Sequence, residues 1–214
     1  MKIEIWSDIA CPFCYIGKRH FENALASLNS QNDVEVEWKS FQLNPDQISQ
    51  PGKTINQYLS EAKGITEERA RDMNEYVTKM AAESGLEYHM DKIVLANSGR
   101  AHQIIQFAKT KNLGDEAEEF FFRSYFCEGA DLADVNFLLK AGTTIGLDPG
   151  DVANILNSNE FRSAVENDIR EASELGIQGV PFFVINRKYG ISGAQPVDVF
   201  VQTLQGAMKE ELAS

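Results

Sequence analysis

Two cysteines separated by two residues are the part of this chain best suited to chemistry. Cys11 and Cys14 enclose Pro12 and Phe13 in a Cys-Pro-Phe-Cys motif. The thiolate form of cysteine is the nucleophile of disulfide exchange, and a helix N-terminus favours an anion through its free N–H groups and its dipole. The motif therefore predicts a dithiol that cycles between reduced and oxidised forms, provided that Cys11 begins a helix.

The residues around the motif predict that helix and a strand before it. Residues 2–7 alternate between polar and apolar side chains, as a half-buried strand does. We therefore expect Cys11 at the N-terminus of the following helix, with Cys14 one turn later on the same side. The apolar residues after the motif have the spacing of one helical face: Phe21, Ala24, Leu25 and Leu28.

Two other roles for the cysteine pair are less consistent with the sequence. A structural disulfide across so short a spacer closes a small loop and gains little chain entropy. A structural zinc ion needs four ligands, whereas the sequence has one further cysteine, Cys127, and three scattered histidines, His20, His89 and His102. We therefore expect no metal site, and we expect Cys127 to be a buried free thiol whose further role is open.

Composition sets the class of protein. A chain of 214 residues with 43% hydrophobic residues suits one compact unit with room for an inserted subdomain. A formal net charge of −12 disfavours nucleic acid and anionic membranes as partners. No stretch approaches the roughly 18 apolar residues of a membrane span, and the N-terminal residues do not form a secretory signal. We expect a cytoplasmic protein, in which cysteines are more often catalytic than structural.

The rest of the sequence separates into a helical block between sheet segments. Alternation predicts a strand over residues 34–41, and proline-containing turns follow it. Residues 54–175 then show almost entirely helical periodicity, with Val135 on an inward face. The predicted helices cover 55–63 and 66–84, further ones begin near Ser98, Asp115, Asp131 and Asp148, and the last ends at Gly176.

The sheet pattern returns near the C-terminus. An apolar run predicts a buried strand over 180–185, followed by a turn at 187–190, a short return strand at 191–192 and a helix from Val197. The order predicts an α/β, thioredoxin-like fold with β-α-β and β-β-α halves and a large all-helical insertion. The core is predicted over 1–52 and 177–214, and the insertion over 53–176, with its last helix packing back on the core.

Several short motifs together resemble the DsbA-like branch of the thioredoxin superfamily, and within it the FrnE-like group. The resemblance covers essentially the whole chain, and it implies a thiol–disulfide oxidoreductase or isomerase without a cofactor of its own. The motifs are Trp6-Ser7-Asp8, Cys11-Pro12-Phe13-Cys14-Tyr15-Ile16-Gly17-Lys18, Phe122-Arg123-Ser124-Tyr125-Phe126, Gly179-Val180-Pro181-Phe182-Phe183 and Gly193-Ala194-Gln195.

The resemblance assigns roles to individual residues. Cys11 matches the nucleophilic cysteine, Cys14 the resolving one, and Pro181 the cis-proline that faces the dithiol. A proline donates no N–H, so a backbone edge stays open for a peptide substrate. The implied partners are a disulfide-containing protein or small thiol, and a redox partner such as thioredoxin or glutathione. The residues expected to contact substrate are Pro12, Phe13, Val180 and Pro181.

One position departs from the best-known member of the branch. DsbA itself has a histidine at the position of Phe13, and a phenylalanine cannot donate a charged hydrogen bond to the Cys11 thiolate. Because the reduced form is then less stabilised, we expect a more reducing dithiol than that of DsbA.

Three polar residues are candidates for tuning the dithiol or for lining a cleft beside it. Asp8 can tune the dithiol or accept its proton through water, and it can equally be a turn-forming residue. Asn97 can cap or turn the segment that opens a helix. His102 can line a cleft beneath the insertion, or it can be a structural or surface histidine.

Two other functions stay open at this point. Glutathione-dependent transferases of the kappa class and 2-hydroxychromene-2-carboxylate isomerases resemble this architecture, and residues 193–195 before the last helix can offer an anion site. Those enzymes generally carry serine at the first cysteine position, whereas this chain keeps Cys11 and Cys14. A non-catalytic binding or chaperone module is the other alternative, and the intact dithiol argues against it.

Overall fold

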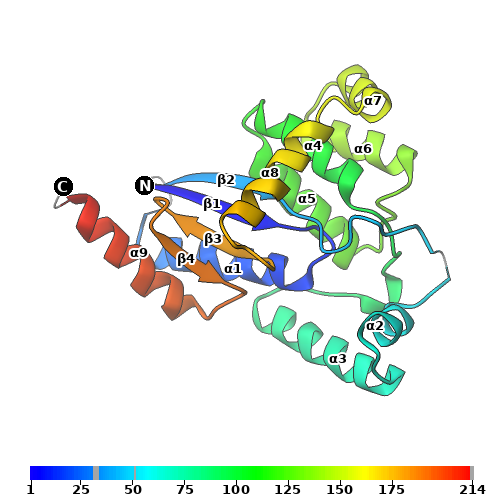
Figure 1. Cartoon of the computed structure of the whole chain (residues 1–214), viewed down its shortest axis with the longest axis horizontal. Coiled ribbons are helices and arrows are strands. Elements are labelled where there is room, and N and C mark those ends of the chain that lie inside the picture. The colour runs from blue at the N-terminus through cyan, green and yellow to red at the C-terminus, as the bar shows by residue number, and fades with distance from the viewer. Residues whose placement is uncertain (31–33, 51, 213–214) are drawn as a thin grey trace. The chain divides into compact units, whose positions relative to one another are not determined.

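The computed structural model describes residues 1–30, 34–50 and 52–212 (Figure 1). Contacts divide the chain into two units: Met1–Leu43 with Glu166–Ser214, and Asn44–Val165. This division does not test the domain limits expected at residues 52 and 177, which stay a prediction.

The first unit contains a four-stranded mixed sheet. The strands β1 (Lys2–Ser7), β2 (Glu35–Ser40), β3 (Phe182–Ile185) and β4 (Tyr189–Ser192) have the spatial order β2-β1-β3-β4. β1 pairs parallel with β2 and antiparallel with β3, and β3 pairs antiparallel with β4. With α1 (Pro12–Ser27) and α9 (Val197–Leu212) these strands form a β-α-β half and a β-β-α half, which confirms the predicted thioredoxin-like fold.

The two faces of β1 bury different sets of side chains. Ile3 and Ile5 lie in an apolar cluster with residues of α1 and α9. Three rings dominate that cluster, Phe21, Phe183 and Phe200, and their centroids lie 4.8–6.1 Å apart. Since successive side chains of a strand point to opposite faces, Trp6 lies in a separate cluster with Ala172 of α8 (Arg162–Glu174) and Val184.

Charged side chains join α8 to the strands on the Trp6 face. The indole N–H of Trp6 donates to the Asp168 carbonyl oxygen at 2.9 Å, and the Asp168 carboxylate accepts the backbone N–H of Ser40. The Lys39 ammonium lies 3.4 Å from Asp168 and 3.3 Å from Glu171. Burial disfavours the Lys39 ammonium, but these carboxylates and that of Glu37 outweigh it and raise the Lys39 pKa.

The β3–β4 turn is held by the same network. Asn186 and Arg187 have φ of 49° and 55°, so both adopt the left-handed conformation that a tight hairpin turn requires. The Arg187 guanidinium pairs with the buried Glu4 carboxylate and lies 2.6 Å from Glu171. These contacts fix a residue type that rarely adopts positive φ.

Between β2 and β3, the regular structure of the described residues is all helical, which confirms the predicted insertion. Side-chain caps define several starts: Thr54 and Gln57 form a capping box, and Asp134 and Asp148 accept N–H groups of the first turns that follow them. None of the described helices is long and apolar enough to cross a membrane. Before α8 the helices are α2 (Ile55–Lys63), α3 (Glu67–Glu83), the 3₁₀ helix η1 (Met90–Lys92), α4 (Gly99–Lys109), α5 (Gly114–Phe126), α6 (Val135–Ile145) and α7 (Pro149–Ser158).

Some local predictions were wrong. β4 begins at Tyr189, within the predicted turn, and β3 begins only after Pro181. Val135, predicted inward, is exposed at the first position of α6, directly after the capping residue Asp134. Cys127 lies at the C-terminal end of α5 and is only partly buried.

The packing of Phe200 on Phe21 and Phe183 is expected to hold α9 on the sheet. Phe200→Ala is expected to lower the free energy of unfolding by about 3–5 kcal/mol, because it leaves a cavity beside Phe21 and Phe183. Val199→Ala, at an exposed neighbouring position, is the matched control. Urea denaturation followed by tryptophan fluorescence measures the loss, since both tryptophans lie in the first unit. Equal losses in the two variants would contradict the packing described.

Candidate active site

The turn from β1 into α1 places Cys11 at the helix N-terminus. Cys11 is the N-cap residue, Pro12 occupies the first helical turn, and the Cys11 N–H donates to the Asp8 carbonyl oxygen at 2.9 Å. The Cys11 side chain accepts no capping hydrogen bond, and the first turn of α1 contains no acidic residue. The helix N-terminus is therefore left to stabilise a thiolate at Cys11.

The segment before β3 lies against this cysteine. The antiparallel register pairs Trp6 with Phe182, so the residues before Phe182 run beside the residues that follow Trp6. The Val180–Pro181 peptide bond is cis. The Cys11 thiol donates to the Val180 carbonyl oxygen at 3.4 Å. The sheet thus brings together the cysteine and the proline segment that the sequence singled out.

Gly17 permits α1 to approach Pro181 closely. A Cβ atom at Gly17 would lie 2.9 Å from Cγ of Pro181, 3.5 Å from the Phe183 ring and 3.6 Å from Cα of Ala194. Contacts below 3.0 Å force one partner to move. Since Gly17 lies one helical turn after Cys14, its missing side chain sets the distance between the dithiol helix and the proline segment.

The surroundings of Cys14 favour its protonated form. The residue is only 1% exposed. Burial raises the pKa of the Cys14 thiol, as do its hydrogen bond to Cys11 and the charge there, whereas the Asp8 backbone and the Ser7 hydroxyl lower it. Cys14 therefore remains a thiol while a charge resides on Cys11.

Phe13 is the most accessible part of the motif. Its side chain is 37% exposed, whereas Pro12 and Val180 are half-buried. Pro12 and Phe13 follow Cys11 in the chain, whereas Val180, which contacts the Cys11 sulfur, and buried Pro181 precede β3. A molecule that approaches the dithiol can therefore contact both the motif and Val180.

Asp8 has the geometry of a turn-forming residue. Its carboxylate is buried, accepting the Ala10 N–H at 3.2 Å through Oδ1 and the Leu43 N–H at 2.7 Å through Oδ2. These bonds tie the β1–α1 turn to the segment after β2. Asp8 thus shapes the loop that carries Cys11, and a direct part in tuning the dithiol stays a prediction.

Asn97 and His102 belong to the second unit. Asn97 turns the chain into α4, since its Oδ1 accepts the Gly99 N–H at 2.8 Å and its Nδ2 donates to the Pro45 carbonyl oxygen at 2.7 Å. His102 is fully buried within α4, so it is not a surface histidine. A part for either residue in a substrate cleft stays a prediction.

The sequence interpretation missed three residues around the dithiol. Ser7 and Gly17 were quoted as motif residues but were given no role. Lys18, also quoted only as a motif residue, is buried: it pairs with Glu22, and its ammonium lies 5.8 Å from the centre of the Trp38 ring. Their adjacency to the motif was the only available signal, because the contacts that explain them come from distant strands.

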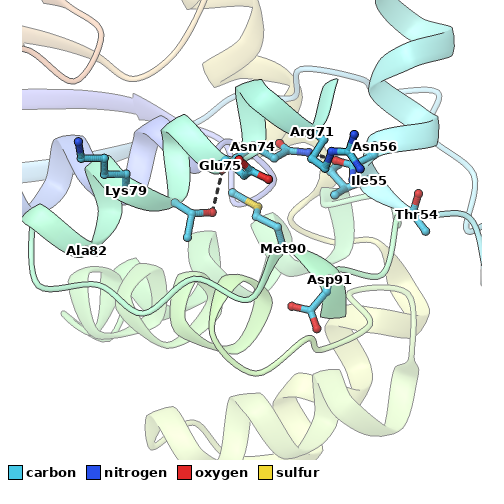
Figure 2. A pocket seen from close by; sticks show the side chains of 11 residues that line it. Thr54, Ile55, Asn56, Arg71, Asn74, Glu75, Lys79, Ala82, Met90 and Asp91 are labelled. Atoms are coloured by element: carbon cyan, nitrogen blue, oxygen red, sulfur yellow. Dashed lines mark hydrogen bonds between the residues drawn. The ribbon is translucent and has the colours of Figure 1, made fainter. Parts of the chain in front are cut away.

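A pocket of about 510 Å³ lies in the second unit, along α3 and the start of α2 (Figure 2). Its lining includes no cysteine or histidine. The Asn74 amide donates to Asn56 at 2.6 Å, and the Thr78 hydroxyl donates to the Asn74 carbonyl at 2.8 Å. Its more buried polar groups therefore bond to one another, and the pocket has no thiol chemistry to offer.

Within the residues described, no group of His, Cys, Asp and Glu side chains is placed to hold a metal ion.

Comparison with known proteins agrees with this architecture. Residues 2–205 match the family model of the DSBA-like thioredoxin domain. The crystal structure of a Streptomyces coelicolor protein described as a probable DsbA oxidoreductase is 36% identical, with a TM-score of 0.89 over 98% of this chain and 91% of that one. The Bacillus subtilis protein YwbO is 28% identical, over 98% of each chain.

A more distant structure shares the fold. The cytosolic disulfide reductase DsbM from Pseudomonas aeruginosa, crystallised with GSH, has a TM-score of 0.67 and 15% identity over 98% of this chain and all of that one. The match of nearly the whole sequence to one family model, with the paired cysteines at the start of α1, leads to one assignment. The chain belongs to the DSBA-like thioredoxin domain family.

Proposed function

We propose that this protein is a thiol–disulfide oxidoreductase or isomerase of the FrnE-like group, in which Cys11 is the nucleophile and Cys14 the resolving thiol. The observation that carries the proposal is the 3.4 Å contact between the Cys11 sulfur and the Val180 carbonyl oxygen at the N-terminus of α1. It supports the proposal because a sulfur at a helix N-terminus is favoured as an anion, and this one lies beside backbone that can hold a substrate.

The first step is attack by the Cys11 thiolate on a substrate disulfide. A bond forms between the Cys11 sulfur and one substrate sulfur, and the other substrate sulfur leaves as a thiolate that takes a proton from water. The N-terminal N–H groups of α1 stabilise the attacking charge. Cys14 does not compete at this stage, because burial and the adjacent Cys11 keep it protonated.

The second step is resolution of the mixed disulfide by Cys14. Once Cys11 is bonded to substrate it carries no charge, so two of the three influences that raise the Cys14 pKa disappear and burial remains. The Cys14 proton passes to water, and its thiolate attacks the Cys11 sulfur. The substrate sulfur departs as a thiolate, and an external dithiol or two molecules of thiol reduce the Cys11–Cys14 disulfide afterwards.

Val180 offers a backbone edge to a peptide. Among the described residues its N–H and C=O take part in no backbone hydrogen bond, while the next carbonyl, that of Pro181, accepts the Gly193 N–H at 2.8 Å. An extended substrate chain can therefore pair with Val180 as an added strand while its disulfide faces Cys11. This supports a disulfide-bonded polypeptide as the substrate class.

We also propose that the protein works in a reducing compartment with an external redox partner. We propose a cytoplasmic location, with thioredoxin or glutathione as the reductant, because this chain lacks a charged donor at Phe13 that would stabilise the reduced form. Glutathione acts here as a co-substrate, and no resident cofactor takes part.

Serine substitutions at Cys11 and Cys14 should impair the reaction at different steps. Cys11→Ser is expected to lower insulin reduction about 100-fold or more, because a hydroxyl is a far poorer nucleophile than a thiolate. Cys14→Ser should accumulate a mixed disulfide between Cys11 and substrate, visible by non-reducing electrophoresis and mass spectrometry. Cys127→Ser is the control and should retain full activity. Unchanged turnover, or glutathione conjugation that persists in Cys11→Ser, would remove the proposal.

Gly17 provides a test of the contact between α1 and the proline segment. Gly17→Ala should cost about 1–3 kcal/mol of stability, because its Cβ would lie 2.9 Å from Pro181, and should slow insulin reduction by displacing that segment from Cys11. Gly206→Ala is the control: its Cβ meets open space within α9, and alanine favours a helix there. Urea denaturation and an insulin assay measure both effects. Equal behaviour of the two variants would contradict the close approach.

Phe13 should influence the reduction potential. Phe13→His introduces a group that, when charged, stabilises the Cys11 thiolate and hence the reduced protein, so the potential should rise by about 30 mV or more. Phe13→Leu removes the ring without adding a charge, and its potential should stay within roughly 10 mV of the unaltered protein. Equilibration with glutathione buffers measures both. A lower potential in Phe13→His would show that the thiolate is not stabilised from this position.

A further inference from the structure

Ser7 has a buried hydroxyl group that the fold does not account for. Ser7 is the last residue of β1 and is 0% exposed. Its carbonyl oxygen accepts the Phe41 N–H at 2.9 Å, but its Oγ has no hydrogen-bond partner among the residues the structure describes. Buried polar groups are nearly always paired, and an exception calls for an explanation.

The hydroxyl lies on the side of the sheet that carries the dithiol. Ser7 follows Ile3 and Ile5 at alternate positions of β1, and those side chains pack with α1. Cys14 lies in the first turn of that helix, two residues after Pro12. The Ser7 hydroxyl is close enough to the Cys14 sulfur to lower the thiol's pKa, yet it forms no hydrogen bond of normal geometry with the protonated thiol.

We propose that Ser7 is a further catalytic residue, whose hydroxyl donates a hydrogen bond to the Cys14 sulfur when Cys14 ionises to resolve the mixed disulfide. This inference rests on the proposed dithiol function. A thiol is a weak acceptor, whereas a thiolate is a strong one, so the hydroxyl gains its partner when the charge develops. The Ser7 hydroxyl therefore stabilises the Cys14 thiolate more than the Cys14 thiol, and this selective stabilisation favours the resolving step.

The structure also assigns Ser7 to one step. Attack by Cys11 on the substrate puts no charge on Cys14, so the Ser7 hydroxyl contributes nothing to it. In resolution, the Cys14 proton passes to water, the Cys14–Cys11 bond forms, and the bond from Cys11 to substrate breaks with the electron pair leaving on the substrate sulfur. The thiolate that attacks is the atom beside Ser7.

Ser40 supplies a matched control. It is paired with Ser7 across β1 and β2 and is similarly buried. Its backbone N–H donates to Asp168, on the network that joins the sheet to α8. Removal of the Ser40 hydroxyl therefore tests the loss of a buried serine hydroxyl from the neighbouring strand, at a residue that is not among the groups that shift the Cys14 pKa.

The experiment follows both steps in one reaction with 5,5′-dithiobis(2-nitrobenzoate). The fully reduced protein, with Cys127→Ala so that only the dithiol reacts, releases one chromophore when Cys11 attacks and a second when Cys14 resolves. Ser7→Ala should leave the first phase unchanged and slow the second about tenfold, with its pH midpoint raised by about one pH unit. Ser40→Ala should alter neither phase.

The outcomes separate this inference from the proposed function. If the protein with Ser7 intact shows no second release, the dithiol function itself fails. If Ser7→Ala matches that protein, or slows both phases equally, only the role of Ser7 is overturned.

A second measurement follows the ionisation of Cys14 directly and does not depend on the rate of the resolving step. In a Cys11→Ala background, iodoacetamide labelling of Cys14 across pH, read by peptide mass spectrometry, reports its ionisation directly. Ser7→Ala should raise the midpoint by about one pH unit, and Ser7→Thr, which keeps a hydroxyl, should restore it. The same midpoint with and without the hydroxyl would refute the inference.

Discussion

The site depends on the contact between the first turns of α1 and the segment Val180–Pro181. The Cys11 sulfur and the Val180 carbonyl oxygen belong to residues 169 positions apart and lie 3.4 Å from each other. Two features hold them there: the register that pairs Trp6 with Phe182, and the missing side chain of Gly17 opposite Pro181. Cys11 therefore lies beside Val180 only when the central strands have paired and α1 has packed on them.

The same geometry gives Cys11 and Cys14, two chemically identical side chains, different surroundings. Cys11 occupies the N-cap, where the free N–H groups of α1 favour an anion, while burial and proximity to Cys11 keep Cys14 protonated. Part of that protection disappears when Cys11 bonds to a substrate, because Cys11 then has no charge. In the mechanism we propose, formation of the mixed disulfide therefore prepares Cys14 to ionise, and Ser7 and the Asp8 backbone lower its pKa.

Local patterns in the sequence were sufficient for the architecture and for the dithiol. Alternation predicted β1, helical spacing predicted α1 and the insertion, and the motif placed Cys11 at the junction. Contacts between distant segments could not be predicted in this way. No local signal shows that Gly17 faces Pro181, or that Lys18 is buried against Trp38 instead of being solvated. The limits of β3 and β4 also depended on partners, since a strand ends where its pairing ends.

We propose that Cys11, and not Cys14, carries the reactive thiolate in the reduced protein. Labelling of the reduced protein at pH 7 with less than one equivalent of iodoacetamide, followed by peptide mass spectrometry, tests it most directly. We expect the label on Cys11 to exceed that on Cys14 by about tenfold or more, because reactivity follows the thiolate fraction. Preferential or equal labelling of Cys14 would contradict it.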